Sequence, residues 1–132
     1  MSVLLDSHVW IWWVTGQKNL APAKRARLDE LAEAGTPPFL SAISLWEAQM
    51  LYRKKRLTLA INFPVWLTEA SDPVVVQVLP IDTSVVLALD ELPDRFHGDP
   101  ADRIIVATAK VHGMALMTDD KAIRKSRVVK VV

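Results

Sequence analysis

The 132-residue sequence contains no cysteine and only four glycines. The absence of cysteine excludes a disulfide-built fold, a thiolate metal site and a cysteine nucleophile. Any bound metal ion must therefore be held by oxygen or imidazole ligands. The glycines form neither of the two phosphate-binding loops, G-x-x-x-x-G-K-[ST] and G-x-G-x-x-G, and a G-x-S-x-G nucleophile elbow is also missing.

Long hydrophobic runs are absent as well. The N-terminus reaches Asp6 without the basic segment of a signal peptide, and the apolar stretch Val9–Val14 is far too short to span a bilayer. We therefore expect a cytoplasmic protein without membrane contact. Because 51% of the residues are hydrophobic and 23% are charged, disorder is excluded and a single domain over residues 1–132 is expected.

Charge is distributed unevenly, although the net charge of +1 alone says nothing about nucleic acid. Basic residues cluster at 24–27, 53–56 and 121–127, whereas acidic residues concentrate between Asp82 and Asp120. The folded chain can thus present an acidic centre with basic flanks. Each basic cluster taken alone is equally typical of a solvated helix face.

Strands and helices alternate along the chain. Apolar or β-branched runs predict strands at Val3–Leu5, Phe39–Ser41, Val74–Leu79, Ala115–Thr118 and Val128–Val132. Helical spacing and stop signals predict helices in the tryptophan-rich segment before Gly16 and at Ala21–Ala34, Ser44–Lys55, Phe63–Ala70, Thr83–Leu89, Asp102–His112 and a short basic segment after Asp120. Because the strands are apolar on both faces, the pattern predicts a mostly parallel sheet with helices on each side, an α/β sandwich.

Acidic residues mark the ends of predicted strands and the starts of predicted helices. They are Asp6, Glu47, Asp99, Asp102, Asp119 and Asp120. Each has a local explanation: Asp6 can cap a helix, Ser44 and Glu47 match a capping box, and Asp102 suits a cap or a first turn. These explanations do not account for acids gathering at the carboxyl edge of a parallel sheet, where α/β folds bind ligands.

Converging carboxylates predict a metal site, because they cannot all stay ionised without a cation. Oxygen ligands without cysteine select Mg²⁺ or Mn²⁺, whose natural chemistry is phosphodiester hydrolysis. The number of ions stays open. The three histidines, His8, His97 and His112, lack the paired spacing of a zinc site, and we interpret them as packing or surface residues.

Four sequence blocks, in this order, resemble the PIN-domain toxins called VapC. The blocks are Leu4–Trp10, Leu40–Glu47, Gly98–Ala109 and Leu116–Asp120, and the similarity spans essentially the whole chain. The resemblance implies a PIN-like three-layer α/β/α sandwich with a central, mostly parallel sheet. It also implies an endoribonuclease that uses Mg²⁺ or Mn²⁺ to cleave RNA by water attack and leaves a 5′-phosphate.

The resemblance also assigns residues to the site. The four acids of the family fall on Asp6, Glu47, Asp102 and Asp120. Asp99 matches a further acid common in this subgroup, and Asp119 leaves open which of the neighbouring aspartates, Asp119 or Asp120, faces the metal. Ser7 stands where the family has Thr or Ser, so its hydroxyl is expected to support Asp6 or a metal-bound water. We count Thr118 as a second supporting residue.

The implied partners are an RNA substrate (tRNA, rRNA or mRNA), a VapB-type antitoxin of a type II toxin–antitoxin pair and a second copy of the chain. The C-terminal segment of such an antitoxin wraps the toxin and can place an arginine in the acidic site. Five tryptophans in a small domain predict core packing or a protein interface more than base stacking. The first helix, with Trp10 and Trp13 on one side and Trp12 turned away, is therefore a candidate surface for a partner.

Two other functions were weighed against the nuclease. A PIN-like binding module without turnover is disfavoured because none of the four core acids has been lost. A phosphotransfer receiver domain would need an acidic pair near the first strand and an acceptor aspartate after a middle strand. Asp6 stands alone at the first position, and the predicted strand Val74–Leu79 is followed by Pro80.

Overall fold

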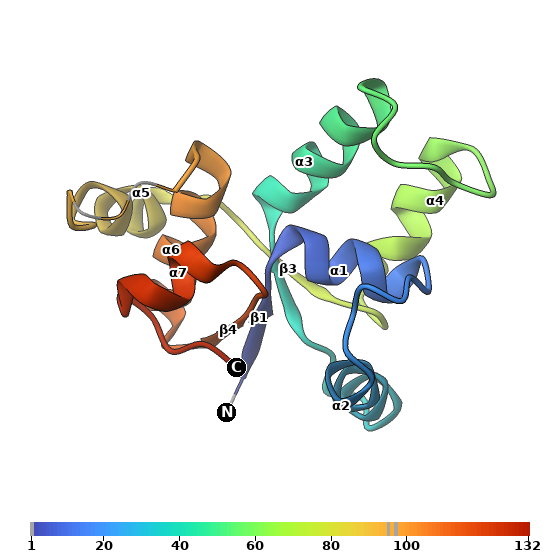
Figure 1. Ribbon diagram of the computed structural model, residues 1–132, viewed down its shortest axis with the longest axis horizontal. Coiled ribbons are helices and arrows are strands. Elements are labelled where there is room, and N and C mark those ends of the chain that lie inside the picture. Colours follow the sequence, from blue (N-terminus) through green and yellow to red (C-terminus); the bar gives the residue numbers. More distant parts are fainter. Residues whose placement is uncertain (1, 95, 97) are drawn as a thin grey trace.

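A computed structural model describes residues 2–94, 96 and 98–132 of the chain (Figure 1). Four short parallel strands form one sheet in the order β3-β2-β1-β4. The strands are β1 (Val3–Leu5), β2 (Phe39–Ser41), β3 (Gln77–Leu79) and β4 (Ala115–Met117). The predicted parallel α/β sandwich is therefore confirmed. No helix among the described residues is long and apolar enough to cross a membrane.

Helices cover both faces of the sheet (Figure 1). One face packs against α1 (Ser7–Val14), α2 (Pro22–Glu33) and α4 (Phe63–Ala70), and the other against α5 (Thr83–Asp90), α6 (Pro100–His112) and α7 (Lys121–Ser126). Helix α3 (Ala42–Arg53) follows directly from the carboxyl end of β2. The predicted loop Leu92–Pro100 includes Arg95 and His97, which lie outside the described residues, and its last residue already belongs to α6.

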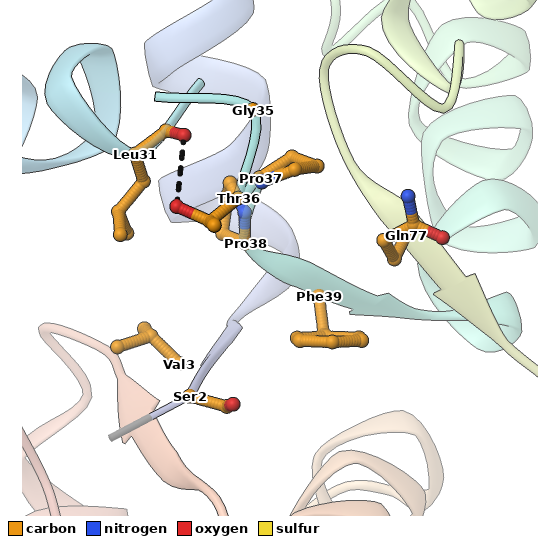
Figure 2. Close-up of a pocket in the computed structure, with 9 residues that line it drawn as sticks. All are labelled: Ser2, Val3, Leu31, Gly35, Thr36, Pro37, Pro38, Phe39 and Gln77. Carbon is orange, nitrogen blue, oxygen red and sulfur yellow. Dashed lines mark hydrogen bonds between the residues drawn. The ribbon is translucent and has the colours of Figure 1, made fainter. Parts of the chain in front are cut away.

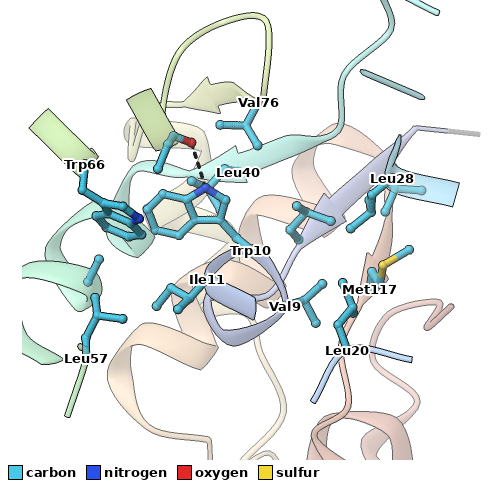
Figure 3. Close-up of a cluster of buried hydrophobic side chains, with 14 residues drawn as sticks. Val9, Trp10, Ile11, Leu20, Leu28, Leu40, Leu57, Trp66, Val76 and Met117 are labelled. Carbon is cyan, nitrogen blue, oxygen red and sulfur yellow. Dashed lines mark hydrogen bonds between the residues drawn. The ribbon is translucent and has the colours of Figure 1, made fainter. Parts of the chain in front are cut away.

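Alternating side chains of the strands feed two separate hydrophobic clusters, as expected for a sheet buried on both faces. Leu4 packs with the α6 side, whereas Val3 and Leu5 pack with the α1 side. Trp10 is fully buried in the cluster on the α1 side, next to Trp66 (Figure 3). Its indole N–H donates to the carbonyl of Ala70 at 2.9 Å. This cluster fixes α1, and with it the residues that precede α1, against the sheet.

Burial also decides the role of the tryptophans. The hypothesis that Trp10 offers a partner surface is wrong, because its side chain has no exposed area. Trp13 is half-buried and its indole N–H donates to Asp29 at 2.9 Å. Core packing, one of the two roles predicted for the tryptophans, is confirmed for Trp10 and Trp66.

Two predicted strands are shorter than expected. The run Val74–Leu79 forms a strand only from Gln77. The residues before it form a turn, in which the side chain of Asp72 accepts from the backbone N–H of Val74. β3 lies at the sheet edge and is largely exposed, so the expectation that all strands are buried on both faces is wrong there. The predicted strand Val128–Val132 is reduced to one isolated bridge between Val131 and Leu116.

Candidate active site

All six predicted acids line one pocket of about 370 Å³. Asp6 follows β1 and the pair Asp119 and Asp120 follows β4, so three of them lie at the carboxyl ends of neighbouring parallel strands. Glu47 comes from α3, and Asp99 and Asp102 come from the start of α6. The remaining lining residues are His8, Val9 and Trp12. The sheet topology therefore gathers acids that are far apart in the sequence.

Asp6 is held on both carboxylate oxygens. Its Oδ1 accepts from the backbone N–H of Ser7 at 2.8 Å, and its Oδ2 accepts from the Thr118 hydroxyl at 2.6 Å. Asp6 is also the N-cap of α1, which is the local role considered for it from the sequence. Capping α1 and lining the pocket are compatible roles, because the capping hydrogen bond fixes the orientation of the Asp6 carboxylate.

Glu47 lies in the second turn of α3 and does not belong to a capping box. The helix begins at Ala42, two residues before the predicted start, and its N-cap is Ser41, whose hydroxyl accepts from the N–H of Ile43 at 3.2 Å. Ser44 is instead fully buried, with its hydroxyl 2.7 Å from that of Ser7. The capping-box interpretation is therefore wrong, because this serine belongs to a tertiary contact.

Ser7 supports two acids in different ways. Its hydroxyl donates to Glu47 Oε1, while its backbone N–H binds Asp6. Of the two roles expected for the Ser7 hydroxyl, support of Asp6 is wrong, because the hydroxyl donates to Glu47. Support of a metal-bound water stays a prediction. Ser44, Ser7 and Glu47 thus form a buried hydrogen-bonded chain that holds the Glu47 carboxylate in one orientation.

Asp99 and Asp102 occupy the start of α6. Asp99 is the N-cap, and its Oδ1 accepts from the N–H of Asp102 at 2.8 Å, so Asp102 is a first-turn acid and not the cap. Gly98 precedes them where no side chain fits, since a Cβ there would lie 2.9 Å from the Phe96 ring and 3.1 Å from the Asp102 Cβ. The approach of the loop to Asp102 therefore requires glycine at this position.

The neighbours Asp119 and Asp120 differ in their contacts. Asp119 is exposed and forms an ion pair with Lys24 of α2, with Nζ to Oδ1 at 2.5 Å. Asp120 caps α7 by accepting from Ile123 N–H at 3.0 Å, and its own N–H donates to the Thr118 hydroxyl at 3.0 Å. Thr118 therefore connects Asp120 to Asp6. Of the two, Asp120 is the one tied to the other acids.

Burial and mutual repulsion both favour protonation of the site. Burial raises the pKa of Asp6 and of Glu47, and the hydrogen bonds from Thr118 and Ser7 only partly offset it. Burial, together with repulsion from Asp99, Asp6, Asp120 and Glu47, raises the pKa of Asp102 to about 7. The pocket therefore carries more negative charge than its own surroundings compensate.

The donor set fits a hard divalent cation. All acidic donors are oxygens, and the excess negative charge is what such an ion would neutralise. Within the part of the chain that the structure describes, no three His, Asp or Glu side chains stand close enough to enclose one ion as they are. Mg²⁺ commonly keeps several waters and binds through one or two carboxylates, so an open set of acids is compatible with it.

Two pocket residues, His8 and Trp12, were not predicted to contribute to a site. His8 is exposed at the start of α1, and its ring centroid lies 5.9 Å from that of Trp12, one helical turn later. Its position lowers the pKa of Asp6, though less than the Thr118 hydrogen bond does. The sequence signal for both was their i, i+4 spacing directly after a helix-capping aspartate.

A larger cavity, of about 580 Å³, lies at the opposite end of the sheet (Figure 2). It is bordered by the amino ends of β1 and β2 and by the turn Gly35–Pro38, where the Thr36 hydroxyl donates to the Leu31 carbonyl at 3.3 Å. Its lining contains no charged side chain. Because parallel α/β sheets bind ligands beyond the carboxyl ends of their strands, the smaller acidic pocket is the better candidate site.

Comparison with known proteins agrees with this geometry. The PIN domain profile matches residues 3–128. The chain is 37% identical to Ribonuclease VapC22 of Mycobacterium tuberculosis over 126 residues, which cover 96% of this chain and 92% of the relative.

Solved structures share the fold. The chain resembles FitAB bound to an IR36 DNA fragment, with a TM-score of 0.68, 25% identity and coverage of 98% of this chain and 93% of that one. It also resembles VapBC2 from Rickettsia felis bound to a promoter DNA fragment, with a TM-score of 0.72, 14% identity and coverage of 100% and 98%. The near full-length matches to the PIN profile and to a VapC ribonuclease show that this chain belongs to the PIN domain family, among the VapC proteins.

Proposed function

We propose that the chain is a metal-dependent endoribonuclease and the toxin of a type II toxin–antitoxin pair. The observation that carries the proposal is the pocket that six carboxylates from four parts of the chain line together, with His8 as the one basic residue in the lining. The relative named Ribonuclease VapC22 supports the choice of RNA as the substrate class.

Each acid has a role in this proposal. Asp6, Asp102 and Asp120 would hold Mg²⁺ or Mn²⁺, and Glu47 and Asp99 are further candidates to contact the ion directly or through water. When bound, the ion would polarise the scissile phosphodiester and lower the pKa of the attacking water. Asp119 is occupied by Lys24 and stays at the rim.

Glu47 is the candidate proton acceptor. Its Oε1 accepts from Ser7, so Oε2 is the oxygen available to take a proton from the attacking water. Burial raises the pKa of Glu47 above its ordinary value, which makes its carboxylate a stronger base. Attack by water with release of the 3′-oxygen leaves a 5′-phosphate on the product.

The proposed partners follow from the neighbouring structures. The neighbouring structures hold FitAB and VapBC2, which supports a VapB-type antitoxin as the partner. We further propose that the chain forms a homodimer or a larger toxin–antitoxin complex, as the family resemblance implies. An antitoxin arginine placed in the pocket would neutralise charge that the acids leave uncompensated. The cytoplasmic location and the choice among tRNA, rRNA and mRNA remain predictions from the sequence and its family.

The test of the proposed function is cleavage of total cellular RNA by purified protein without antitoxin, in the presence of Mg²⁺ or Mn²⁺. We expect discrete fragments, and ligation-based mapping of their ends should find 5′-phosphates. Retention of bound RNA with no cleavage under either metal would contradict the proposal and favour a binding module without turnover.

Asp120 and Asp119 provide a matched pair of variants. We expect Asp120→Asn to lower the cleavage rate by roughly 10- to 100-fold, because it weakens a site acid that Thr118 links to Asp6. The cleavage rate of Asp119→Asn should stay within a few-fold of that of the unmodified chain, because the Asp119 carboxylate pairs with Lys24. Rates measured at saturating Mg²⁺ and at limiting Mg²⁺ check this prediction, and a larger loss in Asp119→Asn would reverse the assignment.

A further inference from the structure

Helix α3 connects the carboxylate pocket with a cluster of exposed cations at its C-terminal end. Glu47 lines the pocket, and the preceding residue, Trp46, keeps 53% of its surface exposed. Four consecutive cations, Arg53 to Arg56, follow at the other end of the helix and are all exposed. Figure 1 shows that α3 extends away from the sheet, so these cations lie at the periphery of the molecule.

The helix arranges these side chains in two rows. Residues seven apart lie on one side of an α-helix, so Arg53 follows Trp46, and Lys54, the C-cap, follows Glu47. With a rise of about 1.5 Å per residue, the cations stand about 10 Å beyond the start of each row. A strand within a duplex carries a phosphate about every 3.4 Å along the axis, and an extended single strand spaces its phosphates further apart, so each row spans at most about three nucleotides.

Among the described residues, the side chains of the cations 53–56 have no hydrogen bond or ion pair, whereas two cations of the cluster 24–27, Lys24 and Arg25, have partners. Lys24 pairs with Asp119, and Arg25 donates to three backbone carbonyls at the end of α1 and in the loop after it. Among the residues that the structure describes, the Lys24–Asp119 pair is the sole ion pair. Four neighbouring positive charges therefore have no carboxylate partner in the described part of the fold.

A groove of about 440 Å³ lies at the same end of α3. It is lined by Tyr52, Arg53, Lys55, Leu57, Thr58 and Leu59. The Tyr52 ring stacks on Phe63 with centroids 4.8 Å apart and remains 38% exposed. Cations that follow a backbone, combined with exposed aromatic rings that stack on bases, are the features by which proteins hold single-stranded nucleic acid.

The helix dipole offers a simpler explanation for part of this pattern. A cation near a helix C-terminus is favoured by the dipole, which accounts for Arg53 or Lys54. The dipole does not account for the exposed Trp46 in the second turn of α3, next to Glu47 in the sequence. It also does not favour four adjacent cations, which repel one another when no anion is present.

We propose that this side of α3 guides a single strand of RNA into the carboxylate pocket. Trp46 stacks on a base next to the scissile phosphate, and Arg53 and Lys54 contact phosphates at most about three nucleotides away. The inference rests on the proposed ribonuclease activity and adds to it a substrate-binding surface outside the acidic pocket. RNA is favoured over a protein partner because the four charges at this end of α3 are all positive and follow the helix that carries Glu47.

The first test is equilibrium binding of a fluorescein-labelled single-stranded RNA to the Asp6→Asn protein, which keeps the surface but should not cut. Adding Arg53→Gln and Lys54→Gln should weaken binding about tenfold at moderate salt. It should also reduce the slope of log K against log salt by about 1.4, since each phosphate contact contributes about 0.7 on single strands. The matched control, Lys18→Gln with Lys130→Gln, removes two exposed cations elsewhere and should change affinity less than twofold.

The second test concerns Trp46. Trp46→Ala should weaken RNA binding about tenfold, Trp46→Phe should restore most of it, and Trp46→Leu should not, because stacking requires an aromatic ring. Equal restoration by leucine, a changed oligomeric state of Trp46→Ala, or cation variants that bind like their control would overturn the proposal. Cleavage by the unmodified chain is scored separately, so a failed surface and a failed ribonuclease assignment are told apart.

Discussion

Replacing Asp6 by asparagine is expected to lower the rate of RNA cleavage on the order of 10³-fold while leaving the fold in place. Charge stabilisation by a bound divalent ion is worth several kcal/mol, and each ~1.4 kcal/mol corresponds to a tenfold rate change. Asp6 is the acid most firmly held in the pocket, because both of its oxygens are fixed by Ser7 and Thr118. A neutral amide there cannot replace the carboxylate as a metal ligand.

Asparagine is the informative substitution at this position because Asp6 has a structural role as well. Its side chain caps α1, and replacing an N-cap by alanine costs about 1 kcal/mol. Alanine would also leave the buried Thr118 hydroxyl without its acceptor. Asparagine keeps the shape of the side chain and an oxygen for the Ser7 N–H, and its amide can donate to the Thr118 oxygen, although the Thr118 proton then loses its acceptor. Measuring unfolding beside cleavage therefore separates loss of activity from loss of the fold.

Single-turnover cleavage and thermal unfolding, measured on the same preparations, check the Asp6 prediction. Asp90→Asn, which neutralises an exposed aspartate at the end of α5, is the control and should match the unmodified chain in both assays. Near-normal cleavage by Asp6→Asn would show that the assigned pocket is not the catalytic centre.

The convergence of the acids could be predicted because it depends on topology more than on detail. Parallel strands carry their functional residues at one edge, so Asp6 after one strand and Asp120 after another had to approach each other once the strands were neighbours. The helix starts near Glu47 and Asp102 face the same edge for the same reason. The pocket lining contains all of these residues.

The role of Ser44 could not be predicted, because the local pattern was misleading. Serine three residues before glutamate is a capping signal, yet the helix begins earlier at Ser41, and Ser44 contacts Ser7, which is 37 residues away in the sequence. Likewise, helical spacing places Trp10 and Trp13 on one side of α1 but does not say which is buried. That depends on α4, whose Trp66 and Ala70 cover Trp10.

Strand lengths at the margins of the sheet also escaped prediction. A β-branched run such as Val74–Leu79 favours extended backbone, but a strand forms only where a neighbour offers hydrogen bonds. β3 has one neighbour, β2, whose three residues pair with Gln77–Leu79 only. The segment after α7 pairs with β4 only at the bridge between Val131 and Leu116, so it does not form a strand of several residues.

Removal of divalent metal is expected to abolish cleavage, and the same ion should stabilise the fold in a manner that depends on pH. The pKa of Asp102 is raised to about 7, and those of Asp6 and Glu47 are raised as well. The folded protein therefore binds more protons than the unfolded chain between about pH 4 and pH 7. Stability of the metal-free protein should thus fall as the pH rises through this window.

Metal binding should reverse that trend, because the ligands must be deprotonated to bind and the ion then compensates their repulsion. Saturating Mg²⁺ should change the Tm little at pH 5 and raise it by several degrees at pH 8, as measured by calorimetry with and without EDTA. Asp102→Asn removes the acid whose pKa the other four acids raise. The Tm of the metal-free Asp102→Asn protein should therefore depend less on pH than the Tm of the Asp90→Asn protein. Equal stabilisation by Mg²⁺ at both pH values, or full cleavage in EDTA, would contradict a carboxylate-bound metal, because both effects require the same ionised acids.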